Sequence, residues 1–123
     1  MIVSWQLTLV LMLLAHFLAD YTLQGWLADG KQKAWWKKQL ENLESTKYKF
    51  DYLMALACHS MYWAILICLP FYASPYFLHA IVVNSAVHAV VDDQKCNRFK
   101  LNLIEDQLWH FVQIGLTFML LMV

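Results

Sequence analysis

The chain alternates long apolar runs with shorter polar segments. The apolar runs occupy residues 2–27, 50–72, 76–93 and 104–123. A helix needs about 20 predominantly apolar residues to cross the roughly 30 Å of hydrocarbon in a bilayer. Pro70 and Pro75 bracket a short turn between the second and third runs, as expected of an antiparallel helical hairpin. The pattern predicts an all-α fold with one domain over residues 1–123. Four transmembrane helices would form an antiparallel bundle, with loops at 28–49 and 94–103.

The basic residues predict the orientation of these helices. All nine lie in the two longer loops: Lys31, Lys33, Lys37, Lys38, Lys47, Lys49, Lys95, Arg98 and Lys100. Because Lys and Arg near helix ends are held on the cytoplasmic side, both loops are expected to be cytoplasmic. The protein would then be multi-pass in a bacterial inner or plasma membrane, with both termini on the outer, periplasmic side.

The first loop carries an apolar stripe of its own. Trp35, Trp36, Leu40 and Leu43 recur at helical spacing among lysines. The stripe predicts a short helix lying on the inner membrane surface, and a solvated linker with two tryptophans is the alternative.

Composition supports lipid as the main solvent. Hydrophobic residues make up 61% of the chain and charged residues 15%, whereas soluble proteins are roughly 45–50% apolar and about 25% charged. The formal net charge is zero, and there are only three Gly and two Pro. These values exclude a basic nucleic-acid-binding module, a disordered chain and a collagen-like sequence. Cys58, Cys68 and Cys96 lack the spacing of a disulfide framework or a metal clip and are interpreted as packing residues.

Three His–Asp pairs stand out within the apolar runs. They are His16 with Asp20, His88 with Asp92, and Asp106 with His110, each four residues apart. On a helix, this spacing places both side chains on one face, one turn apart. With this composition, three such pairs among five histidines arise by chance about one time in a hundred.

The pairs also share one depth in the predicted bundle. In the two inward-running helices the aspartate follows the histidine, and in the outward-running fourth helix the order is reversed, so each carboxylate is nearer the cytoplasm. His59 enters the second helix at a similar depth. Ionisable groups in a span cost about 2.5–3.5 kcal/mol each and therefore face one another. The four helices are expected to form one polar layer, with His79 outside it and Trp63, one turn after His59, in a packing role.

Imidazole and carboxylate groups are ligands for transition metals. The predicted ligands are His16, Asp20, His59, His88, Asp92, Asp106 and His110. This set exceeds one tetrahedral shell. It fits two metals that share a carboxylate, or one metal whose ligands are oriented by further Asp–His hydrogen bonds. Zinc, manganese and iron are the candidates. A metal-free proton or ion path and a purely structural polar core are the alternatives.

The motifs resemble those of a known family. They are His16-x-x-x-Asp20, Leu23-Gln24, His59-Ser60, His88-x-x-x-Asp92-x-x-Lys95 and Asp106-Gln107-x-x-His110. In this order they resemble a small family of bacterial and phage membrane proteins catalogued as domain of unknown function thirty-three-oh-seven. The segment from Trp35 to Lys49 is longer than expected for that family. The resemblance covers nearly the whole chain and implies a membrane protein without an established activity. A similarity to membrane-embedded metal-dependent hydrolases is analogy only.

The leading hypothesis is a metal-dependent hydrolase that acts on an anionic phosphoester at the cytoplasmic face. Its catalytic carboxylates would be Asp20, Asp92 and Asp106. The candidates for substrate contacts are Gln24, Lys95 and Gln107, with Lys31 and Lys33 adding positive charge at the rim. An oxidative di-iron centre would use the same ligands. The alternatives are a metal-ion or proton transporter and a small phage or prophage interaction protein with a structural polar core. A homo-oligomer is compatible with each, and no binding of nucleic acid is expected.

Overall fold

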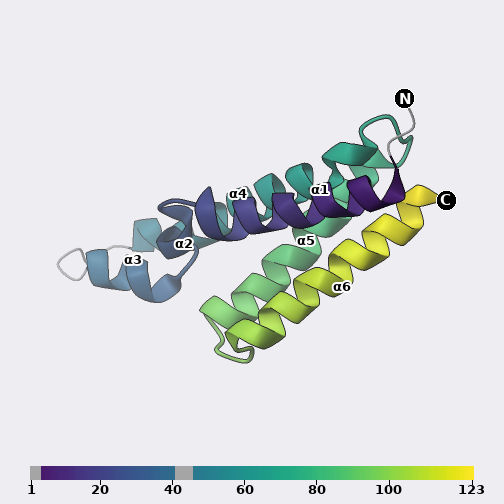
Figure 1. Cartoon of the computed structure of the whole chain (residues 1–123). Coiled ribbons are helices and arrows are strands. Elements are labelled where there is room, and N and C mark those ends of the chain that lie inside the picture. Colours follow the sequence, from purple (N-terminus) through teal and green to yellow (C-terminus); the bar gives the residue numbers. More distant parts are fainter. Residues whose placement is uncertain (1–3, 41–45) are drawn as a thin grey trace.

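The computed structural model describes residues 4–40 and 46–123, and over these residues the only regular secondary structure is helical. The four long helices are α1 (Trp5–Phe17), α4 (Asp51–Cys68), α5 (Phe77–Cys96) and α6 (Leu103–Met122). Two short ones, α2 (Leu27–Gly30) and α3 (Lys33–Gln39), lie between α1 and α4. Figure 1 shows that α1 begins and α6 ends at one end of the molecule, while α2 and α3 lie at the other. The predicted all-α fold is confirmed.

The first helix ends earlier than the predicted boundary at residue 27. A π-helical turn, Leu18–Thr22, continues α1, and the chain then turns at Gly25. Gly25 has φ +52°, in the left-handed region that favours glycine, so the helix cannot continue regularly through it. The predicted start of this helix at residue 2 lies outside the described residues.

The other long helices lie close to their predicted ranges. A 3-10 turn, Leu69–Phe71, extends α4, and α5 continues to Cys96, beyond the predicted limit at residue 93. Helix α6 begins with a capping box, in which the Asn102 side chain accepts from the Glu105 backbone N–H at 2.9 Å and the Glu105 carboxylate accepts from the Asn102 N–H at 2.9 Å. The predicted helix in the first loop corresponds to α3, and Leu43 of its apolar stripe is not among the described residues.

The helices pack unevenly around one core. Helix α4 packs most extensively against α5 and next against α1, whereas α6 makes smaller contacts with α5 and α1. Met12, Trp63, Ile67 and Ile114 are almost completely buried where α1, α4 and α6 meet. This apolar core adjoins the predicted polar layer.

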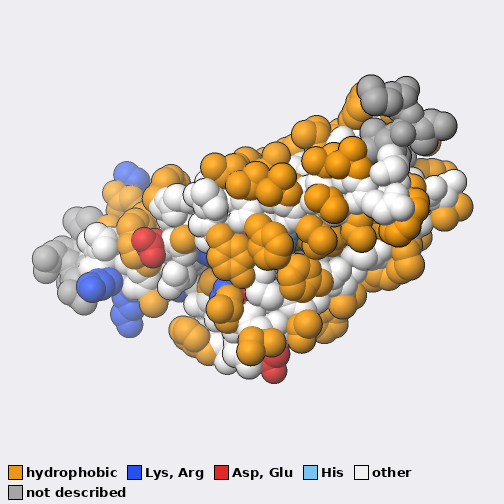
Figure 2. Space-filling model, in the orientation of Figure 1, with side chains coloured by type: hydrophobic (Ala, Val, Ile, Leu, Met, Phe, Trp, Pro, Cys, Tyr) orange, Lys and Arg blue, Asp and Glu red, His pale blue; other side chains and the backbone are white. Residues whose placement is uncertain are grey.

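Large apolar side chains cover much of the outer surface. One example from each long helix is Val10, 57% exposed, Met54, 68%, Val82, 68%, and Leu120, 75%. Figure 2 shows hydrophobic side chains over the bundle, with most of the visible Lys and Arg side chains at the end that holds α2 and α3. Among the described residues, one helical segment, Asp51–Phe71, is long and apolar enough to cross a membrane by length and composition alone.

Candidate metal centre

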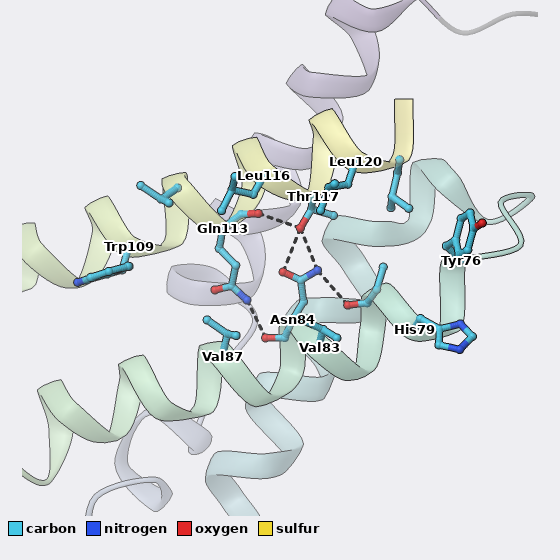
Figure 3. Close-up of a pocket in the computed structure, with 13 residues that line it drawn as sticks. Tyr76, His79, Val83, Asn84, Val87, Trp109, Gln113, Leu116, Thr117 and Leu120 are labelled. Carbon is cyan, nitrogen blue, oxygen red and sulfur yellow. Dashed lines mark hydrogen bonds between the residues drawn. The ribbon is translucent and has the colours of Figure 1, made fainter. Parts of the chain in front are cut away.

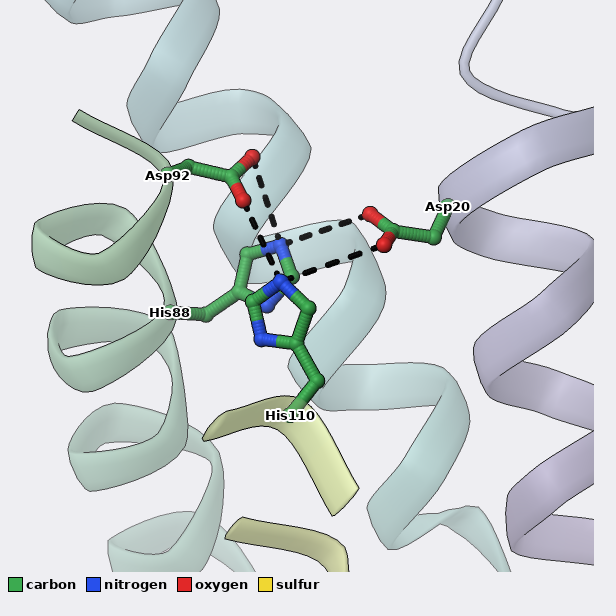
Figure 4. A group of neighbouring side chains, drawn as sticks. All are labelled: Asp20, His88, Asp92 and His110. Carbon is green, nitrogen blue, oxygen red and sulfur yellow. Dashed lines mark ion pairs between the residues drawn. The ribbon is translucent and has the colours of Figure 1, made fainter. Parts of the chain in front are cut away.

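Four of the predicted ligands converge on one point inside the bundle. Asp20, His88, Asp92 and His110 each direct a ligand atom to this point, and these atoms lie within 4.8 Å of one another. All four side chains are buried. Figure 4 shows the two carboxylates on opposite sides of the two imidazole rings, so each carboxylate faces both histidines. This arrangement could hold a metal ion.

The distances from the two imidazole nitrogens to the carboxylate oxygens approach those in a metal coordination shell. Nε2 of His88 lies 3.6 Å from Oδ2 of Asp92 and 3.8 Å from Oδ1 of Asp20. Nε2 of His110 lies 3.3 Å from Oδ1 of Asp92 and 3.9 Å from Oδ2 of Asp20. Ligand atoms bound at about 2.0–2.2 Å in a tetrahedron are roughly 3.3–3.6 Å apart. The group is therefore close to the size that a transition-metal ion requires.

Regular helix geometry explains three of the four side chains, but Asp20 depends on the π-helical turn. The Leu23 N–H donates to the Leu18 carbonyl oxygen at 2.7 Å, five residues back instead of four. Such a turn widens the helix locally and is frequent at functional sites. Asp20 lies in the middle of this turn and reaches the carboxylate and imidazoles of α5 and α6 from across the bundle.

His59 and Asp106 lie beside this group of four. Nε2 of His59 is 3.2 Å from Oδ1 of Asp20, 3.3 Å from Oδ2 of Asp92 and 3.1 Å from Nε2 of His88. Oδ1 of Asp106 is 3.4 Å from Nε2 of His110, and within the described chain neither of these two atoms has a hydrogen-bond partner. Buried polar atoms without partners are rare, and an ion or a water molecule bound between these two atoms would satisfy both.

Aromatic stacking holds the imidazole rings. His88 and His110 are stacked with ring centroids 4.2 Å apart, and Trp63 also stacks against His88 at 4.2 Å and lies 5.5 Å from His110. The Nδ1 atoms of His59, His88 and His110 have no hydrogen-bond partner in the described ranges. Stacking therefore holds the planes of the imidazole rings. The only sign of this role for Trp63 in the sequence was its position one turn after His59.

His16 is the predicted ligand that the structure uses differently. The Trp63 indole N–H donates to Nδ1 of His16 at 2.9 Å. An indole nitrogen can only donate, so Nδ1 accepts and the ring proton lies on Nε2. That proton is donated to Oε1 of Gln107 at 2.9 Å. Both nitrogens of His16 are therefore occupied by protein groups, and His16 lies outside the group of four.

Gln107 completes this chain of hydrogen bonds. Because its Oε1 accepts from His16, its amide nitrogen faces the carboxylates and donates to Oδ2 of Asp20 at 3.0 Å and to Oδ2 of Asp106 at 3.0 Å. The indole of Trp63 thus determines the tautomer of His16, which determines the orientation of the Gln107 amide. Gln107, predicted to contact substrate, here links two carboxylates of the centre.

Two lysines supply positive charge to the centre. Nζ of Lys31 is 2.7 Å from Oδ2 of Asp92, and Nζ of Lys95 is 3.3 Å from Oδ2 of Asp106. Burial alone would lower the pKa of the Lys31 ammonium, but the neighbouring Asp92 carboxylate raises this pKa above its usual value. The predicted position of Lys31 at an open rim is corrected: its side chain is only 6% exposed, because it is turned inward to Asp92.

Gln24 forms a hydrogen bond with Lys31. Its Oε1 accepts from Nζ of Lys31 at 3.2 Å, and its amide nitrogen donates to the backbone carbonyl of Asp20. The three residues predicted to contact substrate, Gln24, Lys95 and Gln107, therefore all make contacts within the protein, and Lys95 is the lysine of the centre that keeps substantial exposure, at 30%.

Comparisons of this chain with protein-family models, with curated proteins and with solved structures find no match. Membership of the family that the His/Asp motifs resemble stays a prediction. The case for a metal rests on the donor set and its geometry.

Proposed function

We propose that this protein is an integral membrane protein that binds one divalent transition-metal ion and hydrolyses a phosphoester at its cytoplasmic face. The observation that carries the proposal is the convergence of four buried ligand atoms within 4.8 Å, from Asp20, His88, Asp92 and His110. Zinc is the first choice because it takes nitrogen and oxygen ligands and can expand from four to five coordination, which would leave a position for water, and manganese or iron would use the same groups.

Charge supports one metal ion instead of two. The carboxylates of Asp20, Asp92 and Asp106 face the ammonium groups of Lys31 and Lys95, which leaves one uncompensated negative charge. One bound divalent ion changes the net charge of the centre to plus one, whereas two bound ions would make it plus three. Unpaired charge is costly to bury, so the lysines take the place that a second cation would have.

The surface and the helix lengths support a place in the membrane. Helices α5 and α6 have 20 residues each, the number needed to cross about 30 Å of hydrocarbon. Their polar residues face the centre, lie at the helix ends or, like Asn84 and Gln113, form hydrogen bonds between α5 and α6. Their outer faces are apolar, with Val82 and Leu120 strongly exposed. We infer that α1, α4, α5 and α6 span the bilayer as a four-helix bundle, with α2, α3 and the lysines on the cytoplasmic side.

The residues around the centre suit hydrolysis of an anion. A divalent ion held by these residues would supply Lewis-acid chemistry for phosphoester hydrolysis, provided that one coordination position stays open to water. His59 lies outside the group of four, and its Nε2–H donates to Oδ1 of Asp20 at 3.2 Å, so it would orient this candidate ligand. Lys95 is part-exposed beside Asp106 and would attract the phosphate. The net positive charge of the loaded centre favours an anionic substrate.

Metal analysis tests the centre directly. Protein purified in mild detergent with zinc, manganese or iron supplied is expected to retain one ion per chain. Asp92→Asn and His110→Ala should each lose it, whereas Asp29→Asn, an exposed aspartate of α2, should keep it. Folded wild-type protein without stoichiometric metal would overturn the proposal.

Activity separates hydrolysis from the transport alternative. We expect phosphate release from a panel of lipid and nucleotide phosphates, abolished by Asp92→Asn. Metal flux into liposomes without phosphate release would instead identify a transporter. Reporter fusions after Val123 test the orientation, because a reporter that works only in the cytoplasm contradicts outward-facing termini.

A further inference from the structure

An apolar groove runs along the outer surface between α5 and α6. It has a volume of about 520 Å³, and its walls include Val83, Val87, Val112, Leu116 and Leu120. Figure 3 shows Val83 and Val87 on one helix, and Leu116 and Leu120 on the other. None of the groove residues carries a formal charge with histidine neutral, so the groove is built for an uncharged, apolar occupant.

A second hollow continues this groove toward the cytoplasmic end. It has a volume of about 480 Å³, shares Val87 and Trp109 with the first, and reaches Gln94 and Leu101. The two hollows together follow α5 from its start, beside Tyr76, to Gln94. At 1.5 Å per residue, this part of α5 is about 27 Å long. One leaflet fills half of the roughly 30 Å hydrocarbon layer, so the two hollows together are longer than one leaflet is thick.

The floor of the groove is polar, but almost all of its side-chain polar atoms have hydrogen-bond partners. Asn84 donates to Oγ1 of Thr117 at 2.9 Å, and the Gln113 amide donates to the backbone carbonyl of Asn84 at 2.7 Å. In the part of the chain that the structure describes, Oε1 of Gln113 is the floor side-chain atom without a hydrogen-bond partner. Asn84 is one helical turn from His88, and Gln113 is three residues from His110, so the floor adjoins the metal centre.

We propose that this groove binds the apolar tail of a membrane amphiphile, a single acyl or isoprenoid chain, whose phosphate head group is the substrate of the centre. The proposal rests on the proposed function, since it requires the chain to lie in a bilayer. Charge complementarity orients the ligand. The inner end of the groove is followed by the basic residues Lys95, Arg98 and Lys100, of which Lys95 is ion-paired with Asp106 and Arg98 with Asp93. The residues at the outer end, Tyr76, His79 and Leu120, carry no formal charge with histidine neutral.

A lipid tail fits the groove better than a second copy of the chain. A stable protein interface buries about 800 Å² on each partner and needs a complementary ridge. The exposed apolar side chains are instead spread over all four long helices, as around a protein solvated by lipid. The groove between α5 and α6 then accommodates the tail of one lipid from the surrounding bilayer.

Photo-crosslinking of the full chain in lipid nanodiscs tests this proposal. The probe is phosphatidic acid with a diazirine midway along one acyl chain, in a phosphatidylcholine bilayer. Mapped by mass spectrometry, labelling is expected to concentrate on Val83, Val87 and Leu116. Val83→Trp fills the groove and should reduce this labelling about tenfold. Its matched control is Val82→Trp, because Val82 is similarly exposed on the same helix but does not line the groove.

Each outcome decides the proposal separately from the metal centre. Labelling spread evenly over the exposed helices, or equal labelling of the Val82 and Val83 variants, overturns the lipid site. Crosslinks between two chains across α5 and α6, with no lipid in the groove, overturn it in favour of a second copy. Metal content is measured on the same samples and reports folding. Retained metal without groove labelling leaves the proposed centre intact, and groove labelling without metal leaves the lipid site intact.

Discussion

The ammonium nitrogen of Lys31 lies 2.7 Å from Oδ2 of Asp92, and both side chains are buried. The two residues are 61 positions apart in the chain, so this ion pair joins the segment after α2 to the inner part of α5. The lysine compensates a carboxylate that also belongs to the group of four candidate ligands. Lys31 therefore supplies the centre with a permanent positive charge from the protein itself.

Removal of this cation should destabilise the protein most when metal is absent. Lys31→Met leaves Asp92 buried without its closest charge partner, a loss of about 3–5 kcal/mol in the free energy of unfolding. Added zinc should reduce the difference from wild type, because the bound ion takes over the compensation of Asp92. Chemical unfolding in detergent, with zinc and with a chelator, measures both values.

The control for this experiment is Lys33→Met, because Lys33 is exposed and lies over the Tyr52 ring at 4.8 Å. It should change stability by less than about 1 kcal/mol. Equal effects of the two substitutions would show that the pair between Lys31 and Asp92 contributes nothing specific.

His16 and His88 should behave differently although both were predicted as ligands. His88→Ala removes a ligand and should abolish stoichiometric zinc binding. His16→Ala removes only the group that orients Gln107, so zinc should bind about 10–100-fold more weakly. Competition titration with a zinc-chelating dye measures both affinities. If His16→Ala loses zinc as completely as His88→Ala, His16 is a ligand and the hydrogen-bond assignment is wrong.

Two substitutions at Trp63 separate its hydrogen bond from its packing. Trp63→Phe keeps an aromatic ring against His88 but removes the donor to His16, so zinc affinity should fall about tenfold with a modest loss of stability. Trp63→Ala also creates a cavity and should cost about 3–5 kcal/mol in unfolding free energy. Trp5→Phe, at an exposed position of α1, should change neither quantity. Unchanged zinc affinity in Trp63→Phe would contradict the orienting role.

The glycines Gly25 and Gly115 should respond in opposite directions to alanine. Gly25 has φ +52°, where a Cβ costs about 1–2 kcal/mol, so Gly25→Ala should destabilise the protein by about that amount. Gly115 lies within α6 with open space at its Cβ position, and Gly115→Ala should stabilise by about 0.5–1 kcal/mol. Thermal unfolding of both variants measures the signs, and the same sign for both would contradict the turn at Gly25.

The parts of the centre that lie on regular helices could be predicted from the sequence. His88 with Asp92 and Asp106 with His110 lie on continuous α-helices, where a spacing of four residues places both side chains on one face. For these pairs, helical periodicity was sufficient to predict that they face the interior. His16 and Asp20 are both buried as well, but His16 bonds to Trp63 and Gln107 and does not join the group of four. The π-helical turn Leu18–Thr22 interrupts the regular helical period at Asp20.

By itself, the sequence determined the helical class, the apolar outer surface and the presence of one polar layer, since these follow from the period and composition of each segment. Only the tertiary structure decided which atoms meet. The hydrogen bonds from Trp63 to His16 and on to Gln107, and the ion pair of Lys31 with Asp92, join residues far apart in the chain. Such contacts depend on how helices pack and on which groups can only donate or only accept, and no local spacing records them.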